Sequence, residues 1–112
     1  MLISIGESLI DLVQSGQDPQ GRPRFCAHEG GSPFNVAIAM ARLGSPTGFL
    51  CPTSSDAFGA QLRACLTQAG VTHLCNGTVD APTALAVVST DDAGHPSYAF
   101  HREKTADRTL DA

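Results

Sequence analysis

The sequence predicts an α/β fold in which short parallel strands alternate with packed helices. Apolar runs at residues 2–5 and 47–51 indicate buried strands because their apolar content hardly alternates, and a weaker third strand is expected at 71–75. The helical segments between these strands end at Gly44 and Gly70. Such alternation is typical of a parallel sheet covered by helices.

Composition limits the class of protein. The chain has 112 residues, of which 42% are hydrophobic and 16% charged, so it is long enough for a small core and too apolar for a disordered segment. The net charge of −4 argues against nucleic acid or an anionic membrane as a partner. No membrane-spanning run and no leader is found, so a cytoplasmic location is expected. The four cysteines lack CxxC spacing and the four histidines are scattered, which favours neutral thiols over a metal site.

A candidate binding residue, Asp11, lies shortly after the first apolar run. That run stops at Gly6, and the segment GESLID follows it. Asp11 is therefore expected just past the C-terminal end of a central strand, where open α/β sheets bind ligands. A solvated turn acid is the alternative for the same residue. Residues 14–24 are rich in Gly, Pro and polar side chains and predict an exposed loop, and residues 25–28 predict a short strand of a small accessory sheet.

The segment EGGSPFNVAIAMARLG joins a glycine pair to an Ala-rich helix. Gly30 and Gly31 permit backbone angles and close approaches that a Cβ atom would prevent. Ser32 is the expected N-cap of a helix over residues 33–43, with proline at its first position. The free N–H groups of the first turn and the side-chain amide of Asn35 suit a small polar or anionic ligand.

The second half of the chain predicts another helix and a hairpin. Asp56 is expected to cap a helix with one apolar stripe at helical spacing, formed by Phe58, Leu62, Cys65, Leu66 and Ala69. Residues 83–90 and 97–101 are β-prone and flank the turn signal DDAG, and Arg102 follows the hairpin. Three short strands plus a hairpin leave sheet faces and edges uncovered, as in the first part of a larger α/β domain.

These segments resemble the ribokinase-like (PfkB) carbohydrate kinases, and most closely their fructokinase branch. The resemblance rests on GESLID, GGSPFNVAIAMARLG, SSDAFGAQLRACLTQAGV and APTALAVVSTDDAGHPSYAFHREKTAD, which follow the family's order and cover nearly the whole chain. It implies a mostly parallel sheet flanked by helices, with a small β lid over a sugar site. Residues 1–112 would form the N-terminal part of one such domain, with lid elements near 11–28 and 83–102.

The resemblance also implies roles for particular residues. Family members transfer the γ-phosphoryl group of ATP, with Mg²⁺, to a sugar hydroxyl. Asp11 matches the aspartate that binds sugar hydroxyls, Asn35 the sugar-binding asparagine, and Arg102 a basic lid residue that can reach the substrate. Gly30 and Gly31 match the glycine pair that lines the sugar pocket.

Two further expectations follow from the resemblance. The family's GAGD-type motif, with the catalytic base and the ATP pocket, is expected beyond residue 112, so this chain is expected to lack a catalytic residue, to bind neither ATP nor Mg²⁺ and to be inactive alone. The lid strands offer a surface through which a homodimer could form.

Departures from the family pattern bear on the substrate. PTSSD precedes the second helix where many members have glycines, and His101 stands before Arg102 where aromatic residues are frequent. Ala86 occupies a position where sugar-acid kinases tend to carry tyrosine, which favours fructose over 2-keto-3-deoxygluconate. Another PfkB-family sugar or nucleoside kinase and a non-catalytic sugar-binding or association module stay open. A nucleotide-binding half-domain fits poorly because neither GxGxxG nor GxxxxGK(S/T) occurs.

Overall fold

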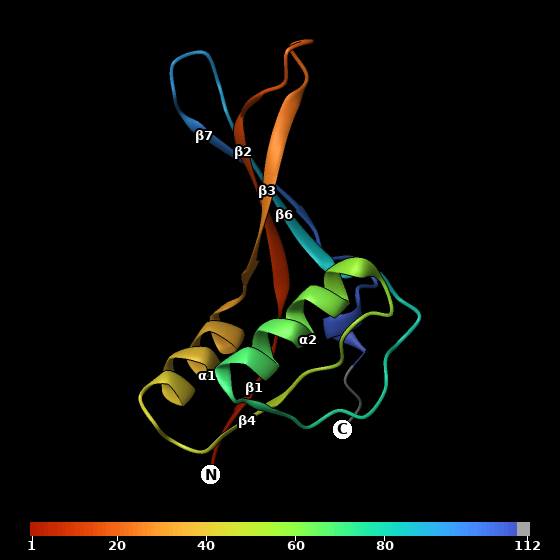
Figure 1. Cartoon of the computed structure of the whole chain (residues 1–112). Coiled ribbons are helices and arrows are strands. Elements are labelled where there is room, and N and C mark those ends of the chain that lie inside the picture. Colours follow the sequence, from red (N-terminus) through yellow and green to blue (C-terminus); the bar gives the residue numbers. More distant parts are fainter. Residues whose placement is uncertain (110–112) are drawn as a thin grey trace.

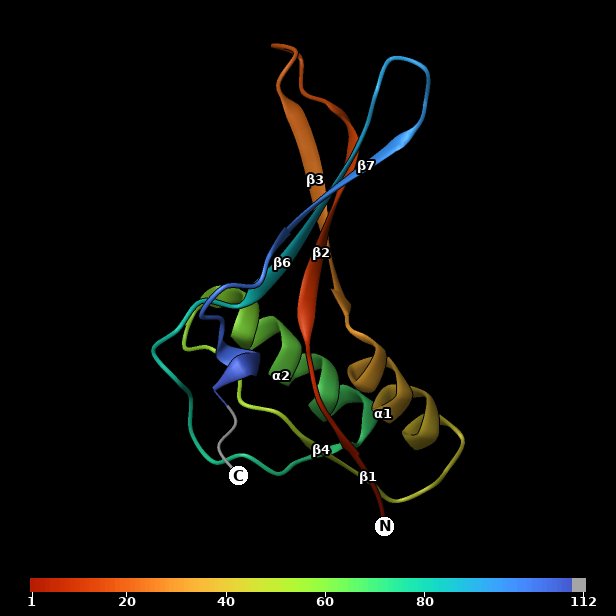
Figure 2. The ribbon, with the colours of Figure 1, turned by 180° about the vertical axis from the view of Figure 1, so that it is seen from behind.

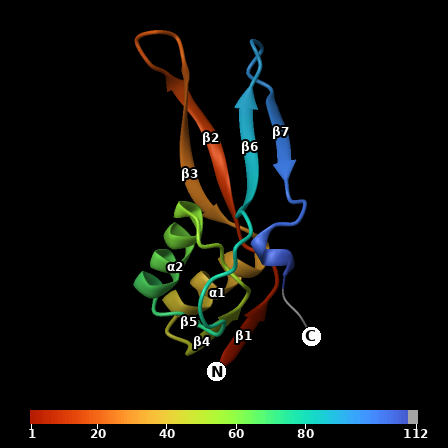
Figure 3. The same cartoon turned by 90° about the vertical axis from the view of Figure 1, so that its right-hand side faces the viewer.

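The computed structural model describes residues 1–109, and its strands form two sheets (Figure 1). The first sheet has three parallel strands in the order β1-β4-β5: β1 (Leu2–Ile5), β4 (Thr47–Leu50) and β5 (Thr72–His73). Helices α1 (Ser32–Arg42) and α2 (Ala57–Ala69) lie side by side against one face of this sheet (Figures 1 and 3). The predicted α/β alternation is therefore confirmed.

The second sheet extends away from the helices as a long arm (Figures 2 and 3). Its order is β3-β2-β6-β7, formed by β2 (Leu9–Gln17), β3 (Pro23–Gly30), β6 (Ala84–Thr90) and β7 (Pro96–His101). The central pair, β2 and β6, is parallel, and both outer pairs are antiparallel. A short 3₁₀ helix, η1 (Ala106–Arg108), follows.

The core lies where the helices meet both sheets. Phe34 of α1 packs edge-on against Phe49 of β4, with ring centroids 5.6 Å apart. The same buried cluster includes Leu62 and Leu66 of the predicted α2 stripe and Ile10 of β2. Because β2 contributes Ile10 to this core, the arm is anchored at its base by apolar burial.

The helix ends follow local sequence signals, with one correction. Asp56 caps α2 as predicted, because its Oδ1 accepts a hydrogen bond from the backbone N–H of Gly59 at 2.8 Å. Ser32, the expected cap of α1, is instead its first residue. Gly31 occupies the cap position with φ of 101°, and α1 has no side-chain cap hydrogen bond.

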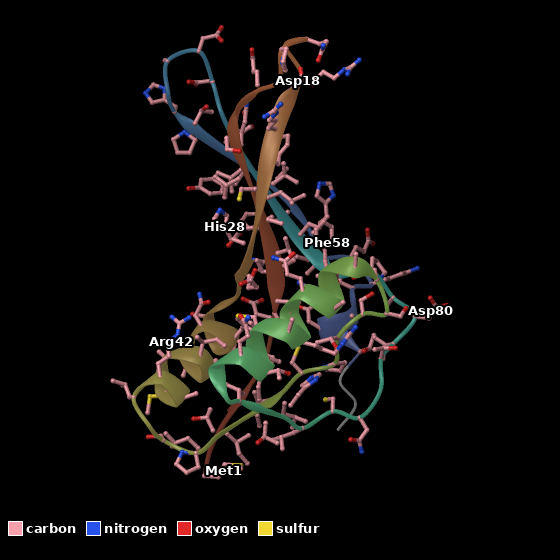
Figure 4. All side chains as sticks on the ribbon, in the orientation of Figure 1. Met1, Asp18, His28, Arg42, Phe58 and Asp80 are labelled. Atoms are coloured by element: carbon pink, nitrogen blue, oxygen red, sulfur yellow. The ribbon has the colours of Figure 1, made fainter. Side chains whose placement is uncertain are left out.

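Two further expectations were wrong. The first strand was expected to be buried, yet Leu2, Ile3 and Ile5 expose 47%, 55% and 57% of their surface. Within residues 1–109 β1 is an edge strand, and because Ser4 faces α1, its neighbours Ile3 and Ile5 project from the opposite face of the sheet. Residues 14–24 were expected to form a loop, but β2 continues to Gln17 and β3 begins at Pro23. Figure 4 shows Asp18 at the tip of the arm, where Oδ1 accepts from two turn N–H groups. Polar residues suit this part of the sheet because it is exposed to solvent.

The predicted hairpin is confirmed by β6 and β7. Tyr98 and Phe100 lie on one face of β7 with their rings stacked, 6.3 Å between centroids. The Asp91 carboxylate closes the connecting turn by accepting from the N–H groups of Ala93 and His95 at 2.9 and 2.8 Å. The predicted accessory sheet at residues 25–28 is also present, as part of the longer strand β3.

Candidate functional site

Asp11 lies inside β2, three residues into a strand of the arm. This corrects the expectation that it follows the end of the first strand, since β1 stops at Ile5 and β2 begins a new sheet at Leu9. The sequence did not separate the two because both apolar runs are short and only three residues lie between them.

The sheet register places Asp11 in a row of four residues. His28 of β3 and Ala86 of β6 are its lateral partners, and Phe100 of β7 is the partner of Ala86. Lateral partners project from the same face of a sheet, so these four side chains share one face. We call Asp11, His28, Ala86 and Phe100 the Asp11 row, and the surface that bears them the Asp11 face.

The two faces of the arm have different surroundings. Ile10 and Leu12, which alternate with Asp11 along β2, belong to the core beneath α2. On the Asp11 face, Leu9, Ala84 and Ala86 form a small buried cluster of their own. Asp11 itself is half-buried, so its carboxylate lies at the border between this apolar patch and solvent.

The glycine pair lies directly beside Asp11. A Cβ atom on Gly30 would come within 2.6 Å of Asp11 Oδ2 and 3.3 Å of Leu9 Cδ1. A Cβ atom on Gly31 would lie 3.0 Å from the backbone oxygen of Glu7, and its φ of 101° is one that side chains rarely adopt. Gly31 is therefore required by its φ and by the adjacent backbone, whereas Gly30 leaves the space that the Asp11 and Leu9 side chains occupy.

The N-terminus of α1 follows immediately. Ser4 of β1 donates from Oγ to the carbonyl oxygen of Pro33 at 2.7 Å, which ties the first turn of α1 to the parallel sheet. Asn35 lies in this turn, with its backbone N–H bonded to Gly31 at 2.8 Å and its surface exposed. A helix start of this kind presents unpaired N–H groups and the positive end of the helix dipole.

Arg102 lies just beyond the end of β7 and turns back over the same face. Its guanidinium carbon is 4.5 Å from the ring centroid of Phe100, and its Nη1 is 3.9 Å from Oε2 of Glu7. The Nε atom is buried without a hydrogen-bond partner among residues 1–109. A cavity of about 640 Å³ opens beside this arginine, and its lining includes Thr83, Phe100 and Arg108.

The attachment of β6 is fixed by Asp56. Its Oδ2 accepts from the backbone N–H of Thr83 at 2.9 Å, and its Oδ1 from the Thr83 hydroxyl at 2.7 Å. Burial opposes ionisation of the carboxyl, but hydrogen bonds from Thr83 and Gly59 outweigh it and lower the pKa of Asp56 below its ordinary value. The acid therefore joins the start of α2 to the start of an arm strand.

The structure thus brings Asp11, Gly30 and Gly31 into direct proximity. Arg102 reaches Glu7, whose backbone lies against Gly31, while Asn35 remains exposed on α1. The ion pair between Glu7 and Arg102 was not predicted from the sequence. The stacking of Arg102 on Phe100 was also missed, although their two-residue separation along a strand was a usable signal.

His28, like Phe100, is a residue of the Asp11 row that the sequence did not assign to binding. Figure 4 shows His28 on the arm, between the tip and the helices. His28 is exposed and lies beside Asp11 through the register of β2 and β3. The β3 partner could not be read from the sequence because the turn between these strands looks like a long polar loop.

Residues 1–109 show neither grouped metal ligands nor a nucleotide-binding glycine fingerprint. No three His, Cys, Asp or Glu side chains gather there as a metal site would require. The glycines at the start of α1 lack the spacing of a dinucleotide or P-loop fingerprint. Within the same residues, no helix is long and apolar enough to cross a membrane.

Comparison with known proteins defines the class of this fold and site. Residues 1–112 match the sequence pattern of the pfkB family carbohydrate kinases. The chain therefore belongs to the pfkB family of carbohydrate kinases.

Similar sequences include several fructokinases. The chain is 39% identical to probable fructokinase-4 of Arabidopsis thaliana over 113 residues, which span 98% of this chain and 35% of that protein. It is 34% identical to a fructokinase of Rhizobium leguminosarum bv. trifolii, across 98% of this chain and 33% of that protein. The chain thus spans about a third of the length of these relatives.

Solved structures agree in fold. The crystal structure of fructokinase from Xylella fastidiosa matches 97% of this chain and 34% of its own chain, with a TM-score of 0.85 and 37% identity. A structure of fructokinase from the same organism with bound ATP matches 97% of this chain and 35% of its own, with a TM-score of 0.86 and 35% identity. The arm and the helical layer therefore correspond to an α/β, ribokinase-like architecture over a third of those proteins.

Proposed function

We propose that this chain forms the sugar-binding part of an ATP-dependent sugar kinase that acts on fructose. The observation that carries the proposal is the close approach of the Asp11 carboxylate to Gly30, one residue before the Gly31 cap of α1. It brings an acceptor of hydroxyl hydrogen bonds to a helix end that supplies donors. The match to a family of carbohydrate kinases supports a sugar as the ligand.

The other predicted residues complete this surface. Asn35 adds an amide that can both donate and accept, and Arg102 adds donors from the lid side. Ala86, between Asp11 and Phe100 in the row, contributes only a methyl group and leaves room above the sheet. In this proposal β2, β3, β6 and β7 form the lid of one domain, and the row is its sugar-facing side.

Fructose is favoured over a sugar acid because Ala86 cannot donate to a carboxylate, and the similar proteins named above are fructokinases. Another pfkB-family substrate, such as 2-keto-3-deoxygluconate or a nucleoside, is the alternative within the same class. Specificity of this kind depends on a few contacts to hydroxyl or carboxylate groups.

In this proposal these residues contribute to catalysis by binding and orienting the acceptor sugar. Positioning of the reacting groups contributes substantially to phosphoryl transfer. In the proposal, the catalytic base and the groups that hold ATP and Mg²⁺ lie beyond residue 112. ATP would supply the phosphoryl group, and residues 1–109 would fix the sugar beneath the lid.

A direct test uses the polypeptide encoded by the complete reading frame. It is incubated with ATP, Mg²⁺ and, in turn, fructose, 2-keto-3-deoxygluconate, ribose and adenosine, and the phosphorylated product is followed by ³¹P NMR. The proposal predicts ATP-dependent phosphorylation with the highest kcat/KM for fructose. A preference for a sugar acid over fructose would overturn the choice of substrate. If none of the acceptors gave a phosphorylated product, the proposed kinase activity would be overturned.

A second candidate is a non-catalytic sugar-binding or association module. It is favoured by the exposed rings of Tyr98 and Phe100, at 59% and 57%, next to the open edge of β7. Calorimetry of the chain with fructose, with and without ATP, separates the two. Binding at ordinary affinity without phosphorylated product supports the module, whereas no binding supports a part that depends on further chain for its site.

A further inference from the structure

Glu7 lies beside the proposed site and has no role in it so far. It lies in the short connection between β1 and β2, and its backbone oxygen faces Gly31. Its carboxylate points to Arg102, with Oε2 3.9 Å from Nη1. Glu7 therefore belongs to the floor beside the glycine pair, while Arg102 directly follows the last strand of the arm.

Arg102 is restrained from two directions. The Phe100 ring supports the guanidinium plane from one side at 4.5 Å, and Glu7 holds one end of it. These contacts engage the face of the guanidinium and Nη1, but leave the buried Nε donor unpaired among residues 1–109. An unpaired buried donor is costly, so the contacts with Phe100 and Glu7 must hold Arg102 in this position.

The register fixes the width of the face between Asp11 and Phe100, the residue that supports Arg102. Phe100 is two strands away from Asp11 in the row, a separation of roughly 10 Å between Cα atoms at ordinary strand spacing. Ala86 lies between them and is buried with only a methyl side chain. Asp11 on β2 and Arg102 beyond β7 thus lie at opposite sides of the same face, the first as an acceptor and the second as a donor of hydrogen bonds.

We propose that Glu7 is a positioning residue for sugar binding, because it holds Arg102 across the Asp11 face and so links the floor to the last lid strand. This inference rests on the proposed function and deepens it. Glu7 does not contact the sugar itself. Its charge keeps the arginine extended over Phe100, so that the accessible part of the guanidinium meets the ligand without a search through side-chain rotamers.

The pair is partly exposed, with 33% of the Arg102 side chain and 40% of the Glu7 side chain accessible. Ion pairs of this kind are weak and are screened by salt. The effect of removing the charge should therefore be modest, larger at low ionic strength, and confined to sugar affinity.

The test compares Glu7→Gln, which keeps the shape and removes the charge, with Asp92→Asn, the same change at an exposed site on the β6–β7 turn. In this 112-residue chain, the Arg102 Nε–H signal is assigned by its loss in Arg102→Lys, and its ¹⁵N relaxation is measured. In the polypeptide of the complete reading frame, kcat and KM for fructose are measured at low and high salt.

Glu7→Gln is expected to increase the mobility of the Arg102 Nε–H and to raise KM for fructose about two- to five-fold at low salt, with kcat unchanged. Asp92→Asn should change neither. An unchanged Arg102 signal in Glu7→Gln would overturn the inference, and so would a mobile Arg102 with an unchanged KM.

The outcome also separates this inference from the proposed function. If the wild-type polypeptide phosphorylates no sugar but Glu7→Gln still releases Arg102, the proposed function fails and the positioning of Arg102 by Glu7 stands. If fructose is phosphorylated and Glu7→Gln behaves as Asp92→Asn does, the proposed function stands and Glu7 has no positioning role.

Discussion

Asp11 lies so close to Gly30 that a Cβ atom at this glycine would be 2.6 Å from its Oδ2. The atom it would meet is the far end of a side chain, so the carboxylate rather than the backbone would have to move. Gly30 therefore sets the position of the Asp11 carboxylate, and a substitution there tests the site without removing a polar group.

Gly30→Ala is expected to weaken sugar affinity about tenfold or more, because a displaced carboxylate cannot accept from the same hydroxyls. The fold should survive with a loss of about 1–3 kcal/mol, since one methyl group is added to a packed site. Fructose kinetics and urea unfolding of the same variant measure the two effects.

Gly21→Ala is a suitable control for this variant. Gly21 lies in the β2–β3 turn with φ of 81°, and no atom lies within 4 Å of its missing Cβ. The strain should destabilise the turn without altering fructose kinetics. Equal losses of sugar affinity in the two variants would contradict the role given to Gly30.

Asp56→Asn is expected to destabilise the chain by about 1–2 kcal/mol at pH 7. One carboxylate oxygen accepts from the Thr83 N–H and the other from the Thr83 hydroxyl, and an amide nitrogen can accept from neither. Urea unfolding measures the loss, with Asp80→Asn, an exposed acid on the same surface, as the control.

The contribution of Asp56 depends on pH in a definite direction. The folded-state pKa lies below the unfolded value, so the carboxylate stabilises the fold fully above the unfolded value and progressively less as pH falls through the folded one. The difference between wild type and Asp56→Asn should be constant from pH 7 down to about 5 and shrink below about 4. A difference that grows on acidification would contradict this assignment.

Cys51 is expected to resist alkylation in the folded chain. Burial raises the pKa of its thiol to about 11, so the reactive thiolate is scarce at pH 8. Cys26 is exposed on β3 and should be labelled by iodoacetamide first. Peptide mapping after timed labelling checks this order, and equal rates for the two thiols would show that the core around β4 is open.

Tyr98→Ser is expected to reduce self-association if a homodimer forms through the lid strands, the surface that the sequence analysis suggested for one. The ring is 59% exposed and stacked on Phe100, so it would be buried in such a contact. Sedimentation velocity over a concentration series measures the change, with Leu43→Ser, exposed by 78% at the end of α1, as the control. A wild-type chain that remains monomeric at high concentration would contradict the homodimer.

The sequence predicted the helical layer well because its signals are local. The proline and glycines around α1, the Asp56 cap and the apolar stripe of α2 all act within a few residues. The arm was predicted only in part. The β2–β3 portion carries polar residues on its exposed surfaces and so lacks a clear strand pattern. In addition, the sequence of one strand does not show which distant strand it pairs with.

The candidate site shows the same limit. Asp11 and the glycine pair could be singled out from the residues, and the family resemblance gave them a common purpose. Their contact, and the approach of Arg102 to Glu7, depend on a register that joins residues far apart in the sequence. Local patterns carry no information about such a register.

The most direct measurement is the fructose kinetics of Asp11→Asn in the polypeptide of the complete reading frame. If Asp11 binds sugar hydroxyls, this variant should raise KM for fructose at least about tenfold or abolish turnover, because a buried hydrogen bond to a charged group contributes about 1.5–3 kcal/mol. The KM for ATP should remain unchanged. Wild-type kinetics for fructose in Asp11→Asn would remove Asp11 from the site and contradict the sugar-binding role proposed for this face.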